Sequence, residues 1–228
     1  MIIATWNVNS LKVRLPQVLD WLAAQRPEVL CLQETKLEDK SFPLADIEAV
    51  GYHAVFAGQK TYNGVAILSR QPVQDVVRGI PGFEDPQQRV ISATINDIRI
   101  VCVYIPNGQS LDSDKYQYKL RWLKALHDWL DGELKKYPRL ALLGDYNIAP
   151  EDRDVHDPAA WQGQILCSAA ERAAFQELIG LGLSDVFRKF EQPEKTYSWW
   201  DYRMMGFRRN HGLRIDHILL SPPLPAEC

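Results

Sequence analysis

A carboxylate and a carboxamide stand close together where an apolar run ends, in the segment Leu140-Ala141-Leu142-Leu143-Gly144-Asp145-Tyr146-Asn147. A short apolar run that ends at a turn residue is typical of a strand covered on both faces. The carboxyl ends of such strands are where open α/β sheets bind their ligands. If the chain stays extended beyond Gly144, the side chains of Asp145 and Asn147 point to the same side. The alternative is a loop closed by an Asx turn, because Gly, Asp and Asn are common turn residues.

Polar side chains also end or interrupt three other apolar runs. Asn7 and Glu34 directly follow two of them, and Asp216 lies inside a third. Oxygen ligands suit a hard cation such as Mg²⁺, which is commonly bound by one or two carboxylates together with water and substrate phosphate. Glu34 is therefore a candidate metal ligand, with Asp145, Asp216 and the amide oxygens of Asn7 or Asn147 nearby. For each residue alone, a helix cap or a turn is the simpler interpretation, above all for Glu34, which precedes a loop.

The strands that must position these side chains are predicted from apolar, β-rich runs. Between them, helical spacing runs over Leu15–Leu22 and Leu120–Leu134, and a capping box of Ser168 and Glu171 begins a third helix. A hairpin is predicted across Asn96-Asp97. This order predicts an α/β fold with a mixed sheet, or two packed mixed sheets, flanked by helices. The predicted strands are Ile2–Val8, Glu28–Gln33, Tyr52–Ala57, Gly64–Ser69, Val90–Ile95, Ile98–Ile105, Arg139–Leu143 and Leu213–Ser221.

The composition predicts one large α/β domain over residues 1–228. No apolar run approaches the ~20 residues of a membrane span, and the N-terminus has neither a basic region nor a small-residue cleavage site, so we expect a cytoplasmic protein without a membrane partner. The four cysteines lack CxxC spacing, which argues against a zinc site or disulfides. The formal net charge of -3 gives no global sign of nucleic-acid binding, so such binding must rest on local charge.

One segment, Trp199–Arg214, carries that local charge, and we call it the arginine-aromatic segment. Arginines bind phosphates, and aromatic faces stack on bases or wedge between them. The alternative is a solvated basic loop over a few core aromatics. The segment contains Arg203, Arg208, Arg209 and Arg214 against only Asp201, interleaved with Trp199, Trp200, Tyr202 and Phe207.

Motifs over nearly the whole chain resemble the exonuclease III family, the bacterial apurinic/apyrimidinic endonucleases of the endonuclease/exonuclease/phosphatase superfamily. The resemblance implies a four-layer sandwich of two mixed β-sheets flanked by helices, like that of DNase I. It implies Mg²⁺-dependent DNA repair: cleavage of the phosphodiester 5′ to abasic sites, and removal of nucleotides or blocking groups from the 3′ ends of double-stranded DNA. Apart from the resemblance, we expect that Mn²⁺ can replace Mg²⁺ and that the protein is a monomer, although the sequence does not determine the oligomeric state. The motifs are Thr5–Ser10, Leu32–Lys36, Gly58–Lys60 with Gly64–Ala66, Gln88-Arg89, Gly144–Ile148, Trp200–Arg203 and Gly212–Asp216.

The resemblance also implies roles for single residues. Glu34 is the implied principal metal ligand, assisted by Asn7. Asp145 positions and deprotonates the attacking water, and Asn147 holds the phosphate or that water. Tyr104 contacts the scissile phosphate, although a half-buried strand aromatic is the simpler interpretation of that residue alone. Asp216 completes the predicted catalytic set. Trp200, Arg203 and Phe207 resemble the family loop that lines the abasic pocket and enters the minor groove. The other predicted DNA contacts are Arg208, Arg209, Lys60 and Arg89.

The family pattern continues beyond the Gly212–Asp216 motif to a Ser-Asp-His motif, whereas this sequence ends at Cys228. We therefore expect a domain truncated at its C-terminus, without its last strand or strands, and weakly active or inactive. His217 is not expected to supply the missing histidine, because neighbours in a strand point to opposite faces. We predict that it is structural.

Two other functions stay open. One is a related phosphoesterase that acts on lipids, inositol phosphates or RNA with the same metal site. The other is a catalytically silent DNA-binding protein. The arginine-aromatic segment favours DNA over a small substrate, because a small-molecule site would not need a long basic stacking surface.

Overall fold

The computed structural model describes residues 1–222 and 224. The chain end on which the truncation prediction rests, including Cys228, lies outside the described residues. The chain forms two compact units: unit 1 is Met1–Tyr104 with Tyr137–Asp145, and unit 2 is Ile105–Lys136 with the residues from Tyr146 onward. The interpretation of the chain as a single domain stays a prediction.

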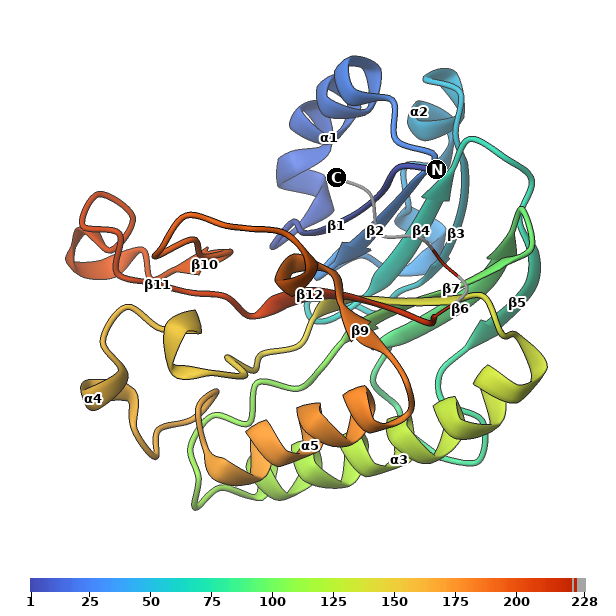
Figure 1. The fold of residues 1–228 in the computed structure, drawn as a ribbon. Helices are drawn as coiled ribbons and strands as arrows, with labels where there is room; N and C mark the ends of the chain where they lie inside the picture. Colours follow the sequence, from blue (N-terminus) through green and yellow to red (C-terminus); the bar gives the residue numbers. More distant parts are fainter. Residues whose placement is uncertain (223, 225–228) are drawn as a thin grey trace. The chain divides into compact units, whose positions relative to one another are not determined.

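The first half of unit 1 is a four-stranded mixed sheet of order β1-β2-β4-β3 (Figure 1). β1 and β2 are parallel, and the other pairs are antiparallel. Side chains such as Leu30 and Leu32 point from the sheet into an apolar core that also contains Leu11, Val18 and Ile47 from the two helices of this unit. The elements are β1 (Ile3–Asn7), α1 (Leu11–Gln25), β2 (Val29–Gln33), η1 (Asp39–Ser41), α2 (Leu44–Ala49), β3 (His53–Ala57) and β4 (Val65–Ser69).

The second half of unit 1 is a run of four hydrogen-bonded strands, β5 (Gln74–Arg78), β6 (Val90–Ile95), β7 (Ile98–Tyr104) and β8 (Leu140–Asp145). β6 and β7 form the predicted hairpin, with Asn96 and Asp97 at positive φ in its turn. β7 and β8 are parallel. The two sheets pack face to face, and Gln33 Nε2 lies 3.3 Å from Cys102 Sγ between them.

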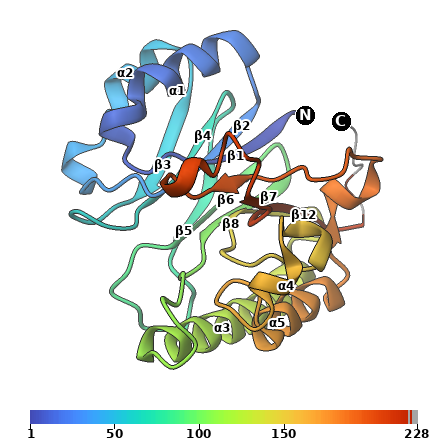
Figure 2. The ribbon, with the colours of Figure 1, turned by 90° about the vertical axis from the view of Figure 1, so that its left-hand side faces the viewer.

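Unit 2 contains two long helices that lie side by side, α3 (Asp114–Lys136) and α5 (Ala169–Gly180) (Figures 1 and 2). The predicted capping box begins α5. The Ser168 side chain accepts from the backbone N–H of Glu171, and the Glu171 side chain accepts from the backbone N–H of Ser168. The other elements are η2 (Asp152–Asp154), α4 (Pro158–Trp161), β9 (Ser184–Asp185), η3 (Val186–Lys189), β10 (Trp199–Trp200), η4 (Arg203–Met205), β11 (Gly212–Leu213) and β12 (Asp216–Leu220).

Most predicted strands are confirmed with small shifts at their ends, but one is wrong. The run over Leu213–Ser221 is divided into β11 and β12, because Arg214 and Ile215 leave the ladder between them. β5 was not predicted, since Gln74 and Asp75 begin it on an exposed edge without an apolar run. Over the described residues, no helix combines the length and the apolar character that a membrane crossing requires.

Candidate active site

Three polar side chains meet at the carboxyl ends of β1, β2 and β8 in unit 1. Asn7 is the last residue of β1, Glu34 follows β2, and Asp145 is the last residue of β8. Asn7 Nδ2 donates to Glu34 Oε1 at 2.9 Å and to Asp145 Oδ2 at 2.8 Å. The strand-end pattern therefore predicted correctly that these three residues converge.

The backbone around this cluster is held in uncommon conformations. Asn9, Glu34 and Lys36 have φ values of 43°, 53° and 54°, in the left-handed region that non-glycine residues rarely adopt. The Asn9 N–H donates to Asn7 Oδ1 at 3.0 Å, and Lys36 Nζ lies 3.0 Å from Glu34 Oε2. Left-handed residues that are fixed by such contacts are enriched at functional sites.

Tyr104 ends β7 next to the same carboxylates. Burial raises the pKa of its phenol above the ordinary value, and the negative charges of Glu34 and Asp145 raise it further. The Arg89 guanidinium carbon lies 4.7 Å from the centre of the Tyr104 ring, and Arg89 donates to the Tyr104 carbonyl at 3.1 Å. A tyrosine is protonated near neutral pH even at its ordinary pKa, and the raised pKa of Tyr104 strengthens this, so its phenol can donate a hydrogen bond.

The donor set at this cluster fits a divalent cation. Glu34 and Asp145 offer the carboxylate oxygens that Mg²⁺ prefers, whereas Asn7 turns its Nδ2 toward both carboxylates and its Oδ1 accepts from the Asn9 N–H. Within the described part of the chain, no group of three or more His, Cys, Asp and Glu side chains is arranged to hold a metal alone. A cation at this cluster would therefore take its remaining ligands from water or substrate, as Mg²⁺ commonly does.

Asn147 and Asp216 belong to unit 2. The chain does not stay extended beyond Gly144, since Asn147 has φ 50°, and strand alternation therefore does not orient its side chain. Asn147 Oδ1 accepts from Asn107 Nδ2 at 3.1 Å, and its Nδ2 donates to the Ile105 carbonyl at 3.0 Å. Asp216 begins β12, where its N–H donates to Ser198 Oγ at 3.0 Å.

His217 is structural, as strand alternation predicted. It is 2 % exposed, its Nε2 donates to the Ile148 carbonyl at 2.8 Å, and its Nδ1 accepts from Arg214 at 2.9 Å. Burial lowers the pKa of the imidazole well below its ordinary value, and the positive charges of Arg214 and Arg188 lower it further. The ring is therefore neutral in the folded protein.

This burial of His217 predicts that acid destabilises the fold. Below about pH 6.5 the unfolded chain binds a proton at this histidine, which the folded chain does not, so the free energy of unfolding falls as pH falls. Between about pH 7.5 and 5.5 we expect the wild type to lose on the order of 1 kcal/mol more than His217→Gln, measured by urea unfolding. The exposed His53→Gln is the control, and equal losses for the wild type and His217→Gln would contradict the prediction.

The arginine-aromatic segment lies in unit 2 and presents apolar side chains to solvent. Phe207 is 72% exposed. Its ring packs edge to face with the Trp200 ring, and the two ring centres are 5.1 Å apart. Met204, which the sequence analysis did not single out, is 79% exposed. Arg203, Arg208 and Arg209 are exposed, and Arg203 pairs with Asp201 at 2.7 Å.

Arg214 corrects the interpretation of this segment as uniformly basic surface. It is 3% exposed and binds the carboxylates of Asp154 and Asp185 at 2.7 and 2.8 Å. The charge count along the sequence missed these partners, because both lie far from Arg214 in the chain.

In unit 1, Lys60 is exposed in the connection between β3 and β4, and its DNA contact stays a prediction.

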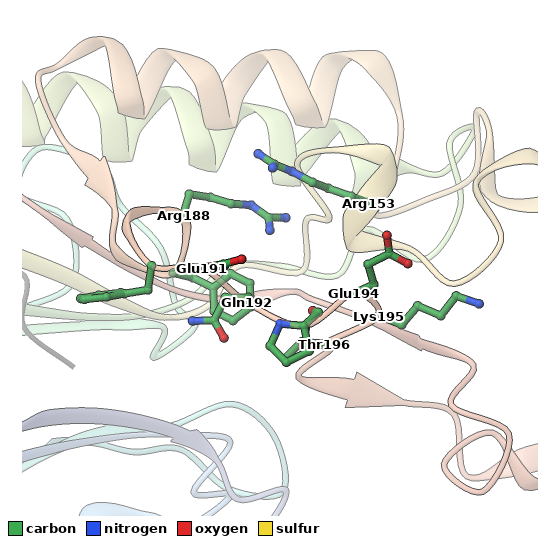
Figure 3. A pocket seen from close by; sticks show the side chains of 10 residues that line it. Arg153, Arg188, Glu191, Gln192, Glu194, Lys195 and Thr196 are labelled. Atoms are coloured by element: carbon green, nitrogen blue, oxygen red, sulfur yellow. The ribbon is translucent and has the colours of Figure 1, made fainter.

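A hollow of about 460 Å³ in unit 2 is formed by η2, η3 and the loop that follows η3 (Figure 3). The cations Arg153, Arg188 and Lys195 line it together with the carboxylates of Glu191 and Glu194. Because the charges are mixed, and Arg188 is paired with Asp154, the hollow gives no strong attraction for a phosphate. A second hollow, of about 380 Å³, adjoins the arginine-aromatic segment and is lined by His156, Trp161 and Trp199 among others.

Two curated nucleases are similar to this chain over nearly its whole length. Exodeoxyribonuclease III of Haemophilus influenzae is 36% identical over 237 residues, covering 98% of this chain and 89% of that protein. The DNA repair nuclease APEX1 of Danio rerio is 33% identical over 237 residues, covering 100% of this chain and 76% of that protein.

Solved structures confirm the predicted α/β fold class. The 3′ phosphatase NExo from Neisseria, solved with a product DNA hairpin, is 50% identical with a TM-score of 0.96, covering 98% of this chain and 87% of that one. An AP endonuclease from Archaeoglobus fulgidus is 41% identical with a TM-score of 0.94, covering 98% of this chain and 88% of that one.

The model of the Endonuclease/Exonuclease/phosphatase family matches residues 4–228, a range that contains the convergent Asn7, Glu34 and Asp145. With matches that span both units and all of the motifs, the chain belongs to the Endonuclease/Exonuclease/phosphatase family.

Proposed function

We propose that this protein is a DNA-repair nuclease of the exonuclease III type, which hydrolyses phosphodiesters of double-stranded DNA with Mg²⁺ as cofactor. Its proposed reactions are cleavage 5′ to abasic sites and 3′-to-5′ trimming of DNA ends, carried out by a monomer in the cytoplasm. The observation that carries the proposal is the meeting of Asn7, Glu34 and Asp145 beside the Tyr104 phenol. The relative named as an AP endonuclease supports the first reaction, and the Neisseria protein, named as a 3′-5′ exonuclease and as a 3′ phosphatase, supports action at 3′ ends.

In this proposal Asp145 positions a water against phosphorus and accepts its proton, which is a carboxylate's role in general base catalysis. Tyr104 donates a hydrogen bond to a phosphate oxygen as negative charge develops there. Glu34 and Asn7 would hold the divalent cation, which when bound supplies Lewis-acid stabilisation to the phosphate and the leaving 3′ oxygen. Asn147 binds the phosphate or the water, and Asp216 keeps the catalytic role that the family resemblance implies.

The arginine-aromatic segment supports duplex DNA as the substrate. Arg203, Arg208 and Arg209 offer charges for phosphates, and exposed Phe207 offers an apolar wedge of the kind that enters a minor groove. The Trp200 ring packs edge to face with the Phe207 ring. Lys60 and Arg89 in unit 1 are the further proposed DNA contacts.

The test compares three duplexes, with an abasic site, a 3′-phosphate or a recessed 3′-hydroxyl, in Mg²⁺, in Mn²⁺ and in chelator. In either metal we expect cleavage of the abasic duplex, release of the 3′-phosphate and trimming of the recessed 3′ end. In chelator each rate should fall at least about 10³-fold. Salt-dependent binding of the abasic duplex without cleavage would instead indicate a silent DNA-binding protein. Cleavage of RNA or an inositol phosphate, with no cleavage of DNA, would indicate the related phosphoesterase.

A further inference from the structure

The four residues after β8, Tyr146–Ala149, form an irregular segment that is almost fully buried, and we call it the Asn147 loop. Asn147 is the most exposed of the four at 6%. Buried backbone N–H and C=O groups outside helices and sheets must find other partners, because leaving them unpaired is costly. The partners of this loop therefore show how it is held.

Three consecutive carbonyls of the Asn147 loop each accept a hydrogen bond from a side chain of a different element. Lys119 of α3 donates to the Asn147 carbonyl at 2.7 Å. His217 of β12 donates to the Ile148 carbonyl at 2.8 Å, and Arg172 of α5 donates to the Ala149 carbonyl at 3.1 Å. These side chains thus supply the hydrogen bonds that the backbone of a neighbouring strand supplies in a sheet.

Of the three donors, Lys119 contacts Asn147, the residue to which the proposed function gives a role at the phosphate or the water. Its ammonium is fully buried and has three donors, which meet the carbonyls of Asn147 and Asn107 and the carboxylate of Glu171. The Asn107 carbonyl is 3.2 Å away, and the Asn107 side chain donates to Asn147 Oδ1. One cation therefore fixes both asparagines of this hydrogen-bonded pair.

Glu171 is in turn fixed by the start of α5. Its Oε1 lies 2.5 Å from Lys119 Nζ and accepts from the Leu166 N–H, while its Oε2 accepts from the backbone and the hydroxyl of Ser168. A buried ion pair costs much desolvation and is often replaceable by apolar residues without loss of stability. The packing of α3 on α5 does not by itself require an ion pair of Lys119 and Glu171. The hydrogen bonds from Lys119 to the carbonyls of Asn147 and Asn107 give the pair a positioning role.

We infer that Lys119, anchored by Glu171, is a positioning residue that fixes Asn147 in its left-handed conformation and so sets the direction of its carboxamide. The inference rests on the proposed function in one respect, since it assumes that Asn147 acts on the phosphate or on the water. The placement of the carboxamide itself is independent of that assumption.

The test removes both charges together, because removing one would leave the other buried and unpaired. We expect Lys119→Met/Glu171→Gln to lower kcat for the abasic duplex about 10- to 100-fold with little change in KM. Asn147→Ala should lower kcat less in the double variant than in the wild type, since the effects of residues that act as one unit are not additive. The matched control is Lys124→Met/Asp128→Asn, which removes an exposed ion pair of the same helix and should change nothing.

A second measurement does not depend on activity. In the double variant we expect the ¹⁵N–¹H resonances of the Asn147 side-chain amide to shift or broaden in the absence of DNA. If these resonances stay in place, or if Asn147→Ala adds its full loss to that of the double variant, the inference is overturned. If the wild type itself fails to cleave DNA, the proposed function fails and the resonances alone decide the inference.

The double variant must fold for this comparison, which circular dichroism and urea unfolding establish. If Lys119→Met/Glu171→Gln fails to fold, Lys119→Gln/Glu171→Gln replaces it with the same expectations. In that variant the two amides can still hydrogen-bond to each other, but the shorter side chain at residue 119 withdraws its donor from the Asn147 carbonyl.

Discussion

Asp145→Asn is expected to lower kcat for the abasic duplex by about 10³-fold, within the range that general base catalysis contributes. The substitution keeps the shape of the side chain but removes the charge that accepts the proton of the water. It also places an amide against Asn7 Nδ2, which donates to Asp145 Oδ2 at 2.8 Å in the wild type. Single-turnover cleavage measures the loss, and fluorescence anisotropy of labelled duplex should show that DNA binding is retained.

The control for this prediction is Asp131→Asn, which removes an exposed carboxylate from α3 and should leave the rate unchanged. A chain with Asp145→Asn that cleaves as fast as the wild type would exclude Asp145 from proton transfer. A rate that falls only because DNA binding is lost would assign Asp145 to substrate binding instead.

Gly144→Ala is expected to lower the free energy of unfolding by about 3 kcal/mol or more, a large effect for one methyl group. Gly144 has φ 151°, and a Cβ built on it would lie 1.9 Å from the carbonyl oxygen of Val103. Val103 is its register partner on the parallel strand β7, so the backbone of one strand must move. Because the next residue is Asp145, the proposed general base, activity should fall together with the free energy of unfolding.

Urea unfolding checks this prediction, and Gly132→Ala is its matched control. Gly132 lies inside α3, where an added Cβ meets nothing within 4 Å. Alanine there should stabilise the protein by about 0.5–1 kcal/mol, because glycine is the weaker helix former. Equal stabilities of Gly144→Ala and the wild type would show that β7 and β8 separate at little cost.

Local patterns predicted a large part of this fold and of the site. Runs of apolar residues gave β1, β2 and β8, and the polar residues at their ends, Asn7, Glu34 and Asp145, meet as expected. The capping box of α5 was equally local, since its two residues are three apart in the chain. Such features are determined by neighbours in the sequence.

Other features depend on partners that no local pattern identifies. Lys119 stands in a helical segment, where a lysine is usually solvent-exposed, yet it is buried against Glu171 of another helix. Arg214 is paired with Asp154, far away in the chain, although its sequence neighbourhood predicts a basic surface. Asn147 leaves the extended conformation for a contact with Asn107.

Glu171 belongs to two structures at once, the first turn of α5 and the ion pair that holds Asn147. Helix ends are where fraying begins, and a cap delays it. Because one carboxylate serves both, we expect the opening of the α5 N-terminus to release the Asn147 loop, as one cooperative unit of local unfolding. The order of a single loop side chain is in this way linked to the stability of a helix end.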